Sequence, residues 1–150
     1  MNKEYMLKAL ELAKKSLVSE DVPVGAVIVK DNKIIGEGYN RREKDGDPTA
    51  HAEIIAIKEA AKSLGNWRLD DCELYVTLEP CPMCAGAIIN SRIKTVVFGA
   101  YETKSGSCSA DSVINLFNLP YNHTPEVYGG IMENDCANLL IEFFKEKRQG

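Results

Sequence analysis

Apolar residues recur at helical spacing near both ends of the chain, in segments 3 to about 19 and 133 to about 148. The first segment begins with Glu4 and ends with Lys14 and Lys15, a charge order that suits the dipole of a helix. Each segment therefore predicts an amphipathic helix with one buried face. The apolar positions are Met6, Leu10, Ala13 and Leu17 in the first segment and Cys136, Leu139, Leu140 and Phe143 in the second.

Short runs rich in apolar and β-branched residues predict the strands of a sheet. The first run turns through Asp31 and Asn32 into the second, which predicts a hairpin. The runs are Val24 to Val29, Lys33 to Ile35, Cys72 to Thr77, Thr95 to Phe98 and Glu126 to Tyr128.

Further helices are predicted between these strands. Thr49 can cap a helix that carries His51 and Glu53 in its first turn and ends at Gly65. The buried face of this helix is expected at Ala50, Ile54, Ile57, Ala61 and Leu64. The other two predicted helices run from Pro82 to about Ser91 and from Asp111 to Phe117, whereas the charged segment Arg41 to Asp47 predicts a surface loop.

A strand, a helix and a strand follow one another between Cys72 and Phe98, which predicts a right-handed crossover and parallel pairing. The alternation along the whole chain favours a three-layer α/β/α architecture. With 150 residues, of which 45% are hydrophobic, the chain is long enough to bury one core. We therefore predict a single domain over residues 1–150.

Composition narrows the possible partners and the compartment. A net charge of −4 gives no general attraction to nucleic acid, so any RNA contact needs a local basic patch. The residues available for such a patch are Arg92, Lys104, Lys145, Lys147 and Arg148. No apolar run resembles a signal peptide or a membrane span, which predicts a cytoplasmic protein without membrane contact. Of the five cysteines, Cys72 and Cys136 are expected in the core and none follows a disulfide spacing.

Two short motifs predict a metal centre. Cys81 and Cys84 are three residues apart where Pro82 opens a helix, so both sulfur atoms project from its first turn. With His51 they make two thiolates and one imidazole, which leaves the fourth tetrahedral position of a zinc ion to water. Glu53 is near enough to reach that water as a general acid and base. His-x-Glu followed by Pro-Cys-x-x-Cys is the signature of zinc nucleobase deaminases.

The same residues have a structural interpretation. Cys81 and Cys84 could be redox cysteines, or half of a four-cysteine structural zinc site, with His51 an ordinary helix residue. The flanking prolines and the His-x-Glu pair at a helix start favour the catalytic interpretation.

Beyond this signature, the chain resembles the bacterial tRNA-specific adenosine deaminases (TadA type) along essentially its whole length. The similar runs are Val22 to Val27, Gly36 to Asn40, Asp47 to Glu53, Leu74 to Cys81, Ser91 to Ile93, Val97 to Ala100, and Asn122 with His123. The resemblance implies a cytidine-deaminase-like fold, with a five-stranded mixed sheet ordered 2-1-3-4-5 and the first strand antiparallel to its neighbours. It also implies a homodimer with one zinc ion per subunit.

The resemblance further implies a reaction and a set of substrate contacts. A zinc-bound hydroxide would attack C6 of the wobble adenosine in a tRNA anticodon stem-loop, and Glu53 would shuttle the protons that yield inosine. Asn40 matches a base contact, and Val24 and Leu78 match apolar pocket walls. His123 matches a contact to the flipped loop. Glu102 stands where the family usually has an aspartate beside the sugar, so that contact is altered by one methylene.

Two other functions are compatible with these motifs. The Glu-Pro-Cys-Pro-Met-Cys run is shared by guanine deaminases, so a free nucleobase or nucleoside of the guanine or cytosine type is an alternative substrate. A non-catalytic, zinc-stabilised RNA-binding subunit is the other alternative. Such a subunit would need a closed metal site, with Cys108 or His123 as fourth ligand.

Overall fold

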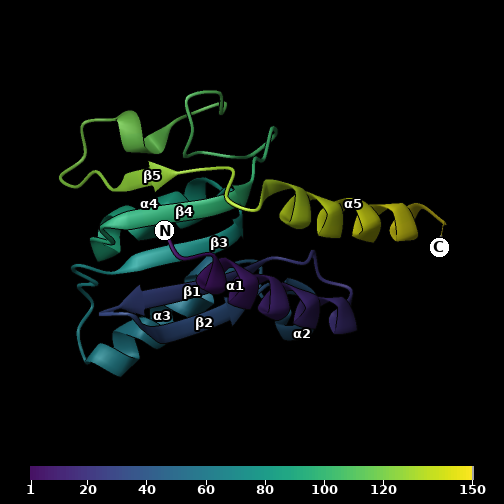
Figure 1. The fold of residues 1–150 in the computed structure, drawn as a ribbon, viewed down its shortest axis with the longest axis horizontal. Coiled ribbons are helices and arrows are strands. Elements are labelled where there is room, and N and C mark those ends of the chain that lie inside the picture. Colours follow the sequence, from purple (N-terminus) through teal and green to yellow (C-terminus); the bar gives the residue numbers. More distant parts are fainter. Residues whose placement is uncertain (150) are drawn as a thin grey trace.

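A five-stranded sheet, ordered β2-β1-β3-β4-β5, forms the centre of the molecule in the computed structural model, which describes residues 1–149 (Figure 1). The strands are β1 (Gly25–Lys30), β2 (Lys33–Tyr39), β3 (Glu73–Leu78), β4 (Thr95–Ala100) and β5 (Glu126–Tyr128). β1 pairs antiparallel with both β2 and β3, whereas β3 with β4 and β4 with β5 pair parallel. The predicted order, the antiparallel first strand and the parallel crossover are all confirmed.

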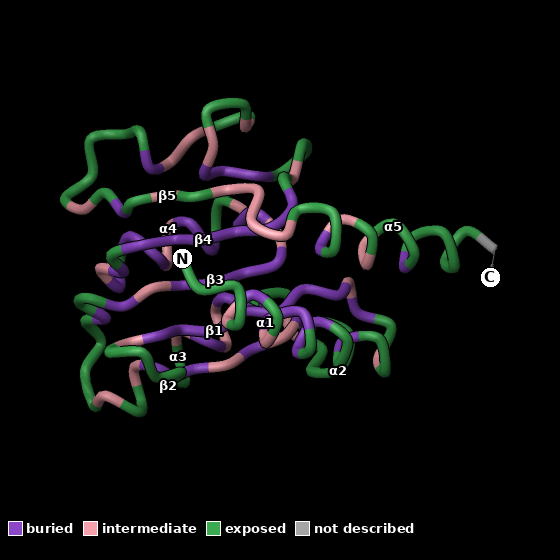
Figure 2. Tube along the Cα trace, in the orientation of Figure 1, coloured by how far each residue is buried: buried purple, intermediate pink, exposed green. Residues whose placement is uncertain are grey.

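Helices cover both faces of the sheet, which confirms the three layers. They are α1 (Lys3–Lys15), α2 (Arg42–Asp45), α3 (Ala52–Leu64), α4 (Pro82–Ser91) and α5 (Glu133–Gln149), with 3-10 turns η1 (Ser16–Ser19) and η2 (Leu116–Asn118). Successive β1 residues point to opposite faces. Ile28 packs in the core with the apolar residues of α3 and α4, and Val27 in the core with those of α1 and α5. β3 and β4 are consequently buried along most of their length (Figure 2).

Helix α3 lies unusually close to β2, and glycine makes this possible. A Cβ atom on Gly38 would lie 2.3 Å from the carbonyl oxygen of Ala52, and one on Gly36 would lie 2.3 Å from that of Ala56. Neither distance is compatible with a side chain. The glycines of β2 therefore set the height of α3 above the sheet, including its first turn.

The buried face of α3 differs from the prediction. Ala52, Ala56 and Ala60 are fully buried against the sheet, while four of the predicted residues are only half-buried, although Ile57, Ala61 and Leu64 among them pack against the edge of the core. Those half-buried residues are Ile54, Ile57, Ala61 and Leu64; Ala50, which precedes the helix, is buried as expected. The prediction placed the larger apolar residues inward, but the close approach of β2 admits only alanine at the contact.

Two predicted loop and helix assignments are wrong. The segment predicted as a loop between Arg41 and Asp47 contains α2, whose backbone N–H groups at Glu43 and Lys44 donate to the carboxylate of Asp21. The predicted helix from Asp111 to Phe117 is absent, and only the 3-10 turn η2 forms. The hydroxyl of Ser112 donates to the carbonyls of Ser109 and Ile114, so local side-chain bonds compete with helical ones there.

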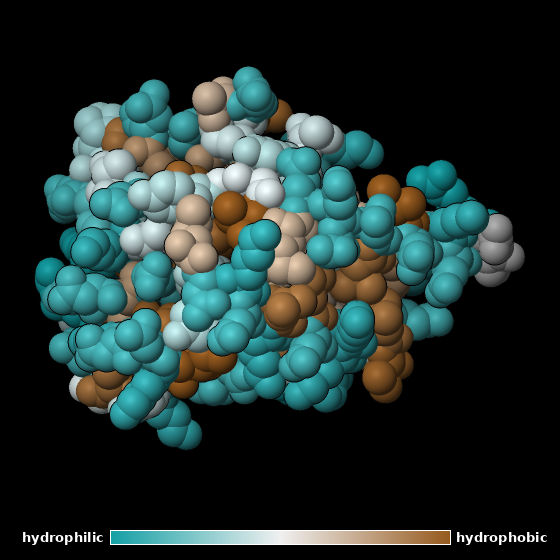
Figure 3. Space-filling model, in the orientation of Figure 1, coloured by the Kyte–Doolittle hydropathy of each residue, from teal (hydrophilic) through white to brown (hydrophobic). Residues whose placement is uncertain are grey.

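The α1–α5 side of the molecule carries exposed apolar side chains. Figure 3 shows them gathered along the two helices, where Leu7 and Ile141 are among the exposed large apolar residues. A groove of about 550 Å³ runs between the helices and is lined in part by Leu10 and Leu139. In the described part of the chain, no helix combines the length and the apolar character that crossing a membrane requires.

Candidate metal and catalytic site

His51 stands at the start of α3 as its N-cap residue, with extended backbone angles of φ −82° and ψ 151°. Its own side chain makes no capping bond, and the Oδ1 atom of Asn40 accepts the N–H of Ala52, the first residue of the helix, at 3.0 Å. Thr49 was expected to cap this helix, and that prediction is wrong. The N–H and hydroxyl of Thr49 both donate to Asp47, each at 2.8 Å. The imidazole of His51 is thus free to serve as a ligand.

Cys81 and Cys84 lie at the start of α4, directly after the carboxyl end of β3. Cys81 is the N-cap of α4, Pro82 follows at the first helical position, and the buried Cys84 lies in the first turn. The predicted bounds of this helix are confirmed. The Sγ atoms of Cys81 and Cys84 each lie 3.6 Å from Nδ1 of His51.

The geometry of these three residues fits a zinc ion. Tetrahedral zinc, with bonds of about 2.3 Å to sulfur and about 2.0 Å to nitrogen, places such ligand atoms about 3.5 Å apart. The three ligand atoms lie within 4.8 Å of one another, and within residues 1–149 no fourth His, Cys, Asp or Glu joins the group. Cys108 directs its thiol toward the carbonyl of Pro80, and His123 is bonded elsewhere. One zinc ion per chain fits this set of donors.

The two thiols share one proton in the absence of metal. A hydrogen bond from Cys84 lowers the pKa of Cys81 to about 4, with a further contribution from His51. The same bond, together with burial, raises the pKa of Cys84. The hydrogen bond with Cys81 also raises the pKa of His51. Cys81 is therefore the thiolate of the pair at neutral pH.

Glu53 lies in the first turn of α3, and only 4% of its surface is exposed. Burial raises the pKa of Glu53 to about 7, and the nearby negative charge of Cys81 adds to the increase. A carboxyl group with a pKa near 7 can both accept and donate a proton at neutral pH. Glu53 also lines the cavity at the metal ligands. It therefore has both the position and the pKa that general acid and base catalysis needs.

A cavity of about 140 Å³ opens beside His51, Glu53 and Cys81. The structure brings four of the five predicted substrate contacts to it. These are Val24, Asn40, Leu78 and Glu102. Asn40 is oriented unambiguously, because its Oδ1 accepts the N–H of Ala52 and its amide NH₂ group is left as a donor.

His123 is not part of this cavity. Its Nε2 atom bonds to the carbonyl of Ile93, which follows the C-terminal end of α4. The metal ligands are at the opposite end of α4, about 15 Å away for a helix of 10 residues. A contact between His123 and the RNA loop stays a prediction, and it would have to be made outside the cavity.

Other residues lining the cavity were not foreseen from the sequence. They are Val22, Arg42, Glu79 and Ser105. Arg42 belongs to a run of mixed charges, and nothing in that run distinguishes it as a residue of the cavity. Glu79 was visible only as part of the run before Pro80 and Cys81, and its many hydrogen bonds come from residues more than 20 positions further on.

Known proteins share this fold and these motifs. Residues 1–100 match the family described as the cytidine and deoxycytidylate deaminase zinc-binding region. A tRNA-specific adenosine deaminase of Bacillus subtilis is 47% identical over 145 residues, which are 97% of this chain and 89% of that protein.

Two solved structures are also similar. One comes from a study of A-to-I editing by tRNA:A34 deaminases at the wobble position of transfer RNA; its TM-score is 0.88 at 41% identity, covering 93% of this chain and all (100%) of that chain. A guanine deaminase of Bacillus subtilis has a TM-score of 0.64 at 50% identity, over 67% of this chain and 66% of that chain. On its fold, its donor set and these similarities, the chain belongs to the zinc-binding cytidine and deoxycytidylate deaminase family, within the group of the tRNA-specific adenosine deaminases.

Proposed function

We propose that this protein hydrolyses the wobble adenosine of a tRNA anticodon to inosine and releases ammonia. The observation that carries the proposal is the convergence of His51, Cys81 and Cys84 on one point beside the buried carboxyl group of Glu53, at the wall of a base-sized cavity. Two thiolates, one imidazole and a non-ligand glutamate are the parts that zinc nucleobase deaminases use.

The first three residues would hold the metal. Nδ1 of His51 and the two Sγ atoms face one another from the starts of α3 and α4, so both helix N-termini add positive potential at the site. When bound, zinc supplies a Lewis acid that makes water reactive at neutral pH.

Glu53 would carry the protons. Its carboxylate takes one proton from the attacking water and passes it to N1 of the adenine ring, next to the carbon under attack. It then delivers the second proton to the amine at C6, which leaves as ammonia while the C6 carbonyl of inosine forms. In the metal-free protein burial raises the pKa of Glu53 to about 7, and a carboxyl group that titrates near neutrality can serve each of these transfers.

The cavity walls would hold the base. Val24 and Leu78 supply apolar surface to the cavity that the metal ligands also line, which suits the faces of a purine. The amide NH₂ of Asn40 is available to an acceptor on the base, because its oxygen is fixed by Ala52. The bond from Ala52 therefore gives Asn40 one orientation before the substrate arrives.

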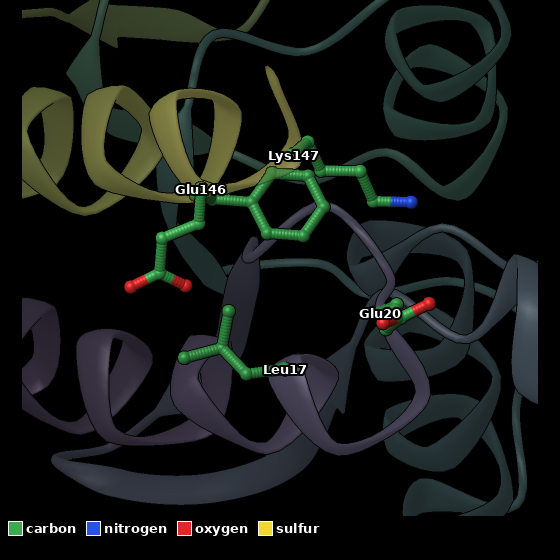
Figure 4. Close-up of a pocket in the computed structure, with 5 residues that line it drawn as sticks. Leu17, Glu20, Glu146 and Lys147 are labelled. Carbon is green, nitrogen blue, oxygen red and sulfur yellow. The ribbon is translucent and has the colours of Figure 1, made fainter. Parts of the chain in front are cut away.

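An extended RNA strand has room beyond the base cavity. A hollow of about 200 Å³ shares Val22, Asn40 and Arg42 with that cavity and continues to Phe143 and Lys147 on α5. A further hollow of about 560 Å³ carries on from these two residues to Leu17 and Glu20, which face α5 from the other side (Figure 4). The ring of Phe143 could stack with a base. Carboxylates outnumber cations along both hollows, with Glu20, Asp21 and Glu43 in the first and Glu20 and Glu146 in the second, so this path adds no electrostatic preference for RNA phosphates.

The alternative is deamination of a free nucleobase. It is supported by the similarity to the guanine deaminase, which extends over 67% of this chain. The similarities to the tRNA enzymes extend over 97% and 93% of it, which favours the RNA substrate. The third function considered from the sequence, a non-catalytic RNA-binding subunit with a closed metal site, is disfavoured because neither Cys108 nor His123 reaches the ligand group.

A substrate panel tests the proposal. Purified zinc-loaded protein is offered an adenosine-containing anticodon stem-loop, guanine, cytosine and cytidine, and inosine and ammonia are followed. We expect the protein to deaminate the stem-loop and none of the other three substrates. Deamination of guanine but not of the stem-loop would favour the alternative function.

We expect the enzyme to act as a homodimer in the cytoplasm, where its proposed substrate is found.

A further inference from the structure

The carboxylate of Glu79 is buried beneath the loop that follows β4. Only 3% of the residue is exposed. One oxygen accepts the N–H of Glu102 at 3.1 Å. The other accepts the N–H groups of Cys108 and Ser109 at 3.0 and 3.1 Å, and the hydroxyl of Ser109 at 3.0 Å. One side chain thus satisfies four donors from both ends of the segment 102–109.

This segment folds tightly around the carboxylate. The N–H of Gly106 donates to the carbonyl of Glu102 at 3.1 Å, and the N–H of Ser107 donates to the carbonyl of Pro80 at 3.0 Å. A Cβ atom on Gly106 would lie 2.5 Å from the carboxyl oxygen of Glu79 and 2.3 Å from the carbonyl oxygen of Glu102. Loop and carboxylate are therefore packed so closely that only glycine fits between them.

The loop that Glu79 holds forms one wall of the cavity. Glu102 and Ser105 both line it, together with Glu79 itself. The carboxylate of Glu102 is in turn fixed by the N–H of Lys104 at 2.9 Å, so its direction depends on the shape of the loop. Within residues 1–149, neither Glu102 nor Ser105 forms a hydrogen bond with a metal ligand, and the loop has no regular secondary structure of its own.

We propose that Glu79 is a positioning residue, which holds the loop 102–109 in the shape that presents Glu102 and Ser105 to the bound nucleotide. The proposal rests on the proposed function, because it assigns the loop to the nucleotide of an RNA substrate. Glu79 stands between Leu78, which lines the cavity, and Pro80, which leads to the ligand Cys81. Glu79 and Pro80 therefore connect the metal ligand Cys81 to the wall of the cavity that the substrate would contact.

The chemistry of the contact requires a carboxylate. An ionised carboxylate only accepts hydrogen bonds, which matches four donors. In Glu79→Gln an NH₂ group must face either the N–H of Glu102 or those of Cys108 and Ser109. One end of the loop is then released, although the size of the side chain is unchanged.

Glu79→Gln and Gly106→Ala test the proposal from the two sides of the same contact. Glu73→Gln is the matched control, since it makes the same change at the other end of β3, where the side chain is half-buried. The wild type is first assayed on the anticodon stem-loop, so that a failure of the proposed function shows before any variant is compared. Zinc content, KM and kcat on the stem-loop, and hydrogen exchange of the loop amides are then measured on all variants.

In both variants we expect full zinc content, a KM raised about tenfold or more with a much smaller change in kcat, and faster exchange at residues 102, 108 and 109. Glu73→Gln should match the wild type. Faster exchange with an unchanged KM would overturn the proposal, since the loop would then be structural only. Loss of zinc in the folded variants would overturn it as well, because Glu79 would act through Cys81. Should Glu79→Gln fail to fold, Ser109→Ala decides between these outcomes, because it removes one of the four donors to the Glu79 carboxylate and adds no atom to the loop.

Discussion

Cys81 Sγ lies 3.6 Å from His51 Nδ1, although the two residues are 30 positions apart and belong to different helices. His51 precedes α3 and Cys81 precedes α4, so the metal site joins the N-termini of the two helices that cover one face of the sheet. A ligand at this point is held by the packing of α3 and α4, and the metal in turn holds the helices.

Replacing a ligand should therefore affect three properties together. Cys81→Ser, Cys84→Ser and His51→Ala are expected to lose zinc, catalytic activity and stability, because a metal that binds only the folded state stabilises it. At a free concentration about 1,000 times its Kd, zinc would add about 4 kcal/mol to the free energy of unfolding. Metal analysis, deamination assays and thermal unfolding with and without chelator measure the three effects. Full activity without stoichiometric zinc in any one variant would contradict the assignment of these three residues as ligands of a catalytic zinc ion.

The close contact between Gly38 in β2 and the start of α3 should affect the affinity of the site for zinc. In Gly38→Ala the new methyl group must displace the carbonyl of Ala52, at the start of α3 beside His51. Overpacking of this kind costs about 1–3 kcal/mol, and here it should also weaken zinc binding. Gly86→Ala is the control, since its Cβ would meet open space. Chelator competition on both variants checks this; equal zinc affinities would show that α3 is not held by this contact.

The local parts of the site were predictable and the long-range parts were not. Cys81, Pro82 and Cys84 form one helix start, so their spacing alone indicates two ligands on one side. The cap of α3 is different, because Thr49 is adjacent in sequence while Asn40 reaches Ala52 from the end of β2. Only the folded sheet brings that amide into place.

The order of the strands has the same origin. Alternation of strands and helices predicted three layers and the parallel pair β3–β4, but the position of β1 between β2 and β3 came from the family resemblance. The hydrogen bonds of Glu79 were the least predictable from the sequence. Its donors are 23 to 30 residues away, in a loop whose sequence is mostly small and polar and carries no periodic pattern.

Zinc affinity should rise with pH. Because the pKa of Cys81 is lowered to about 4, this residue is already a thiolate at neutral pH. The pKa of Cys84 is raised, so binding must displace its proton, and below its own raised pKa His51 must release another. As the pH decreases, the apparent affinity should thus fall by at least about tenfold per pH unit, and more steeply where His51 is protonated as well. Competition with a chromophoric chelator at several pH values measures this slope, and an affinity that does not depend on pH would contradict it.

Glu102→Asp should change activity on RNA and leave the metal untouched. The side chain lines the cavity, and one of its oxygens is held by the N–H of Lys104. A side chain that is one methylene shorter would move the carboxylate relative to the sugar it is predicted to contact. Kinetics on the stem-loop, with zinc analysis beside them, test the contact. Equal turnover by wild type and variant would remove Glu102 from the substrate site.

Glu53→Gln should separate chemistry from binding. Glu53 lies outside the three-residue ligand group, so the variant is expected to keep zinc and to bind the anticodon loop through Asn40 and the apolar walls. It cannot transfer protons, and general acid and base catalysis typically contributes about 10²–10⁴-fold. Since one residue performs several transfers, we expect a loss at the upper end of this range in single-turnover deamination. A loss below about tenfold would refute the catalytic role, and lost zinc would make Glu53 a ligand.

The stability of the same variant should change in the opposite direction to its activity. Burial raises the folded-state pKa of Glu53 from 4.5 to about 7. The folded protein therefore binds an extra proton between these values, and its stability decreases as the pH rises through that window. At about pH 8 the buried charge costs on the order of 1–3 kcal/mol in the zinc-free protein, and Glu53→Gln removes this cost.

A glutamate that merely complements the helix dipole predicts the reverse, a loss of about 0.3–1 kcal/mol in the variant. Denaturant unfolding of both chelated proteins at about pH 5 and pH 8 decides between the two, because only a carboxyl that is desolvated in the folded state makes the variant the more stable protein at the higher pH.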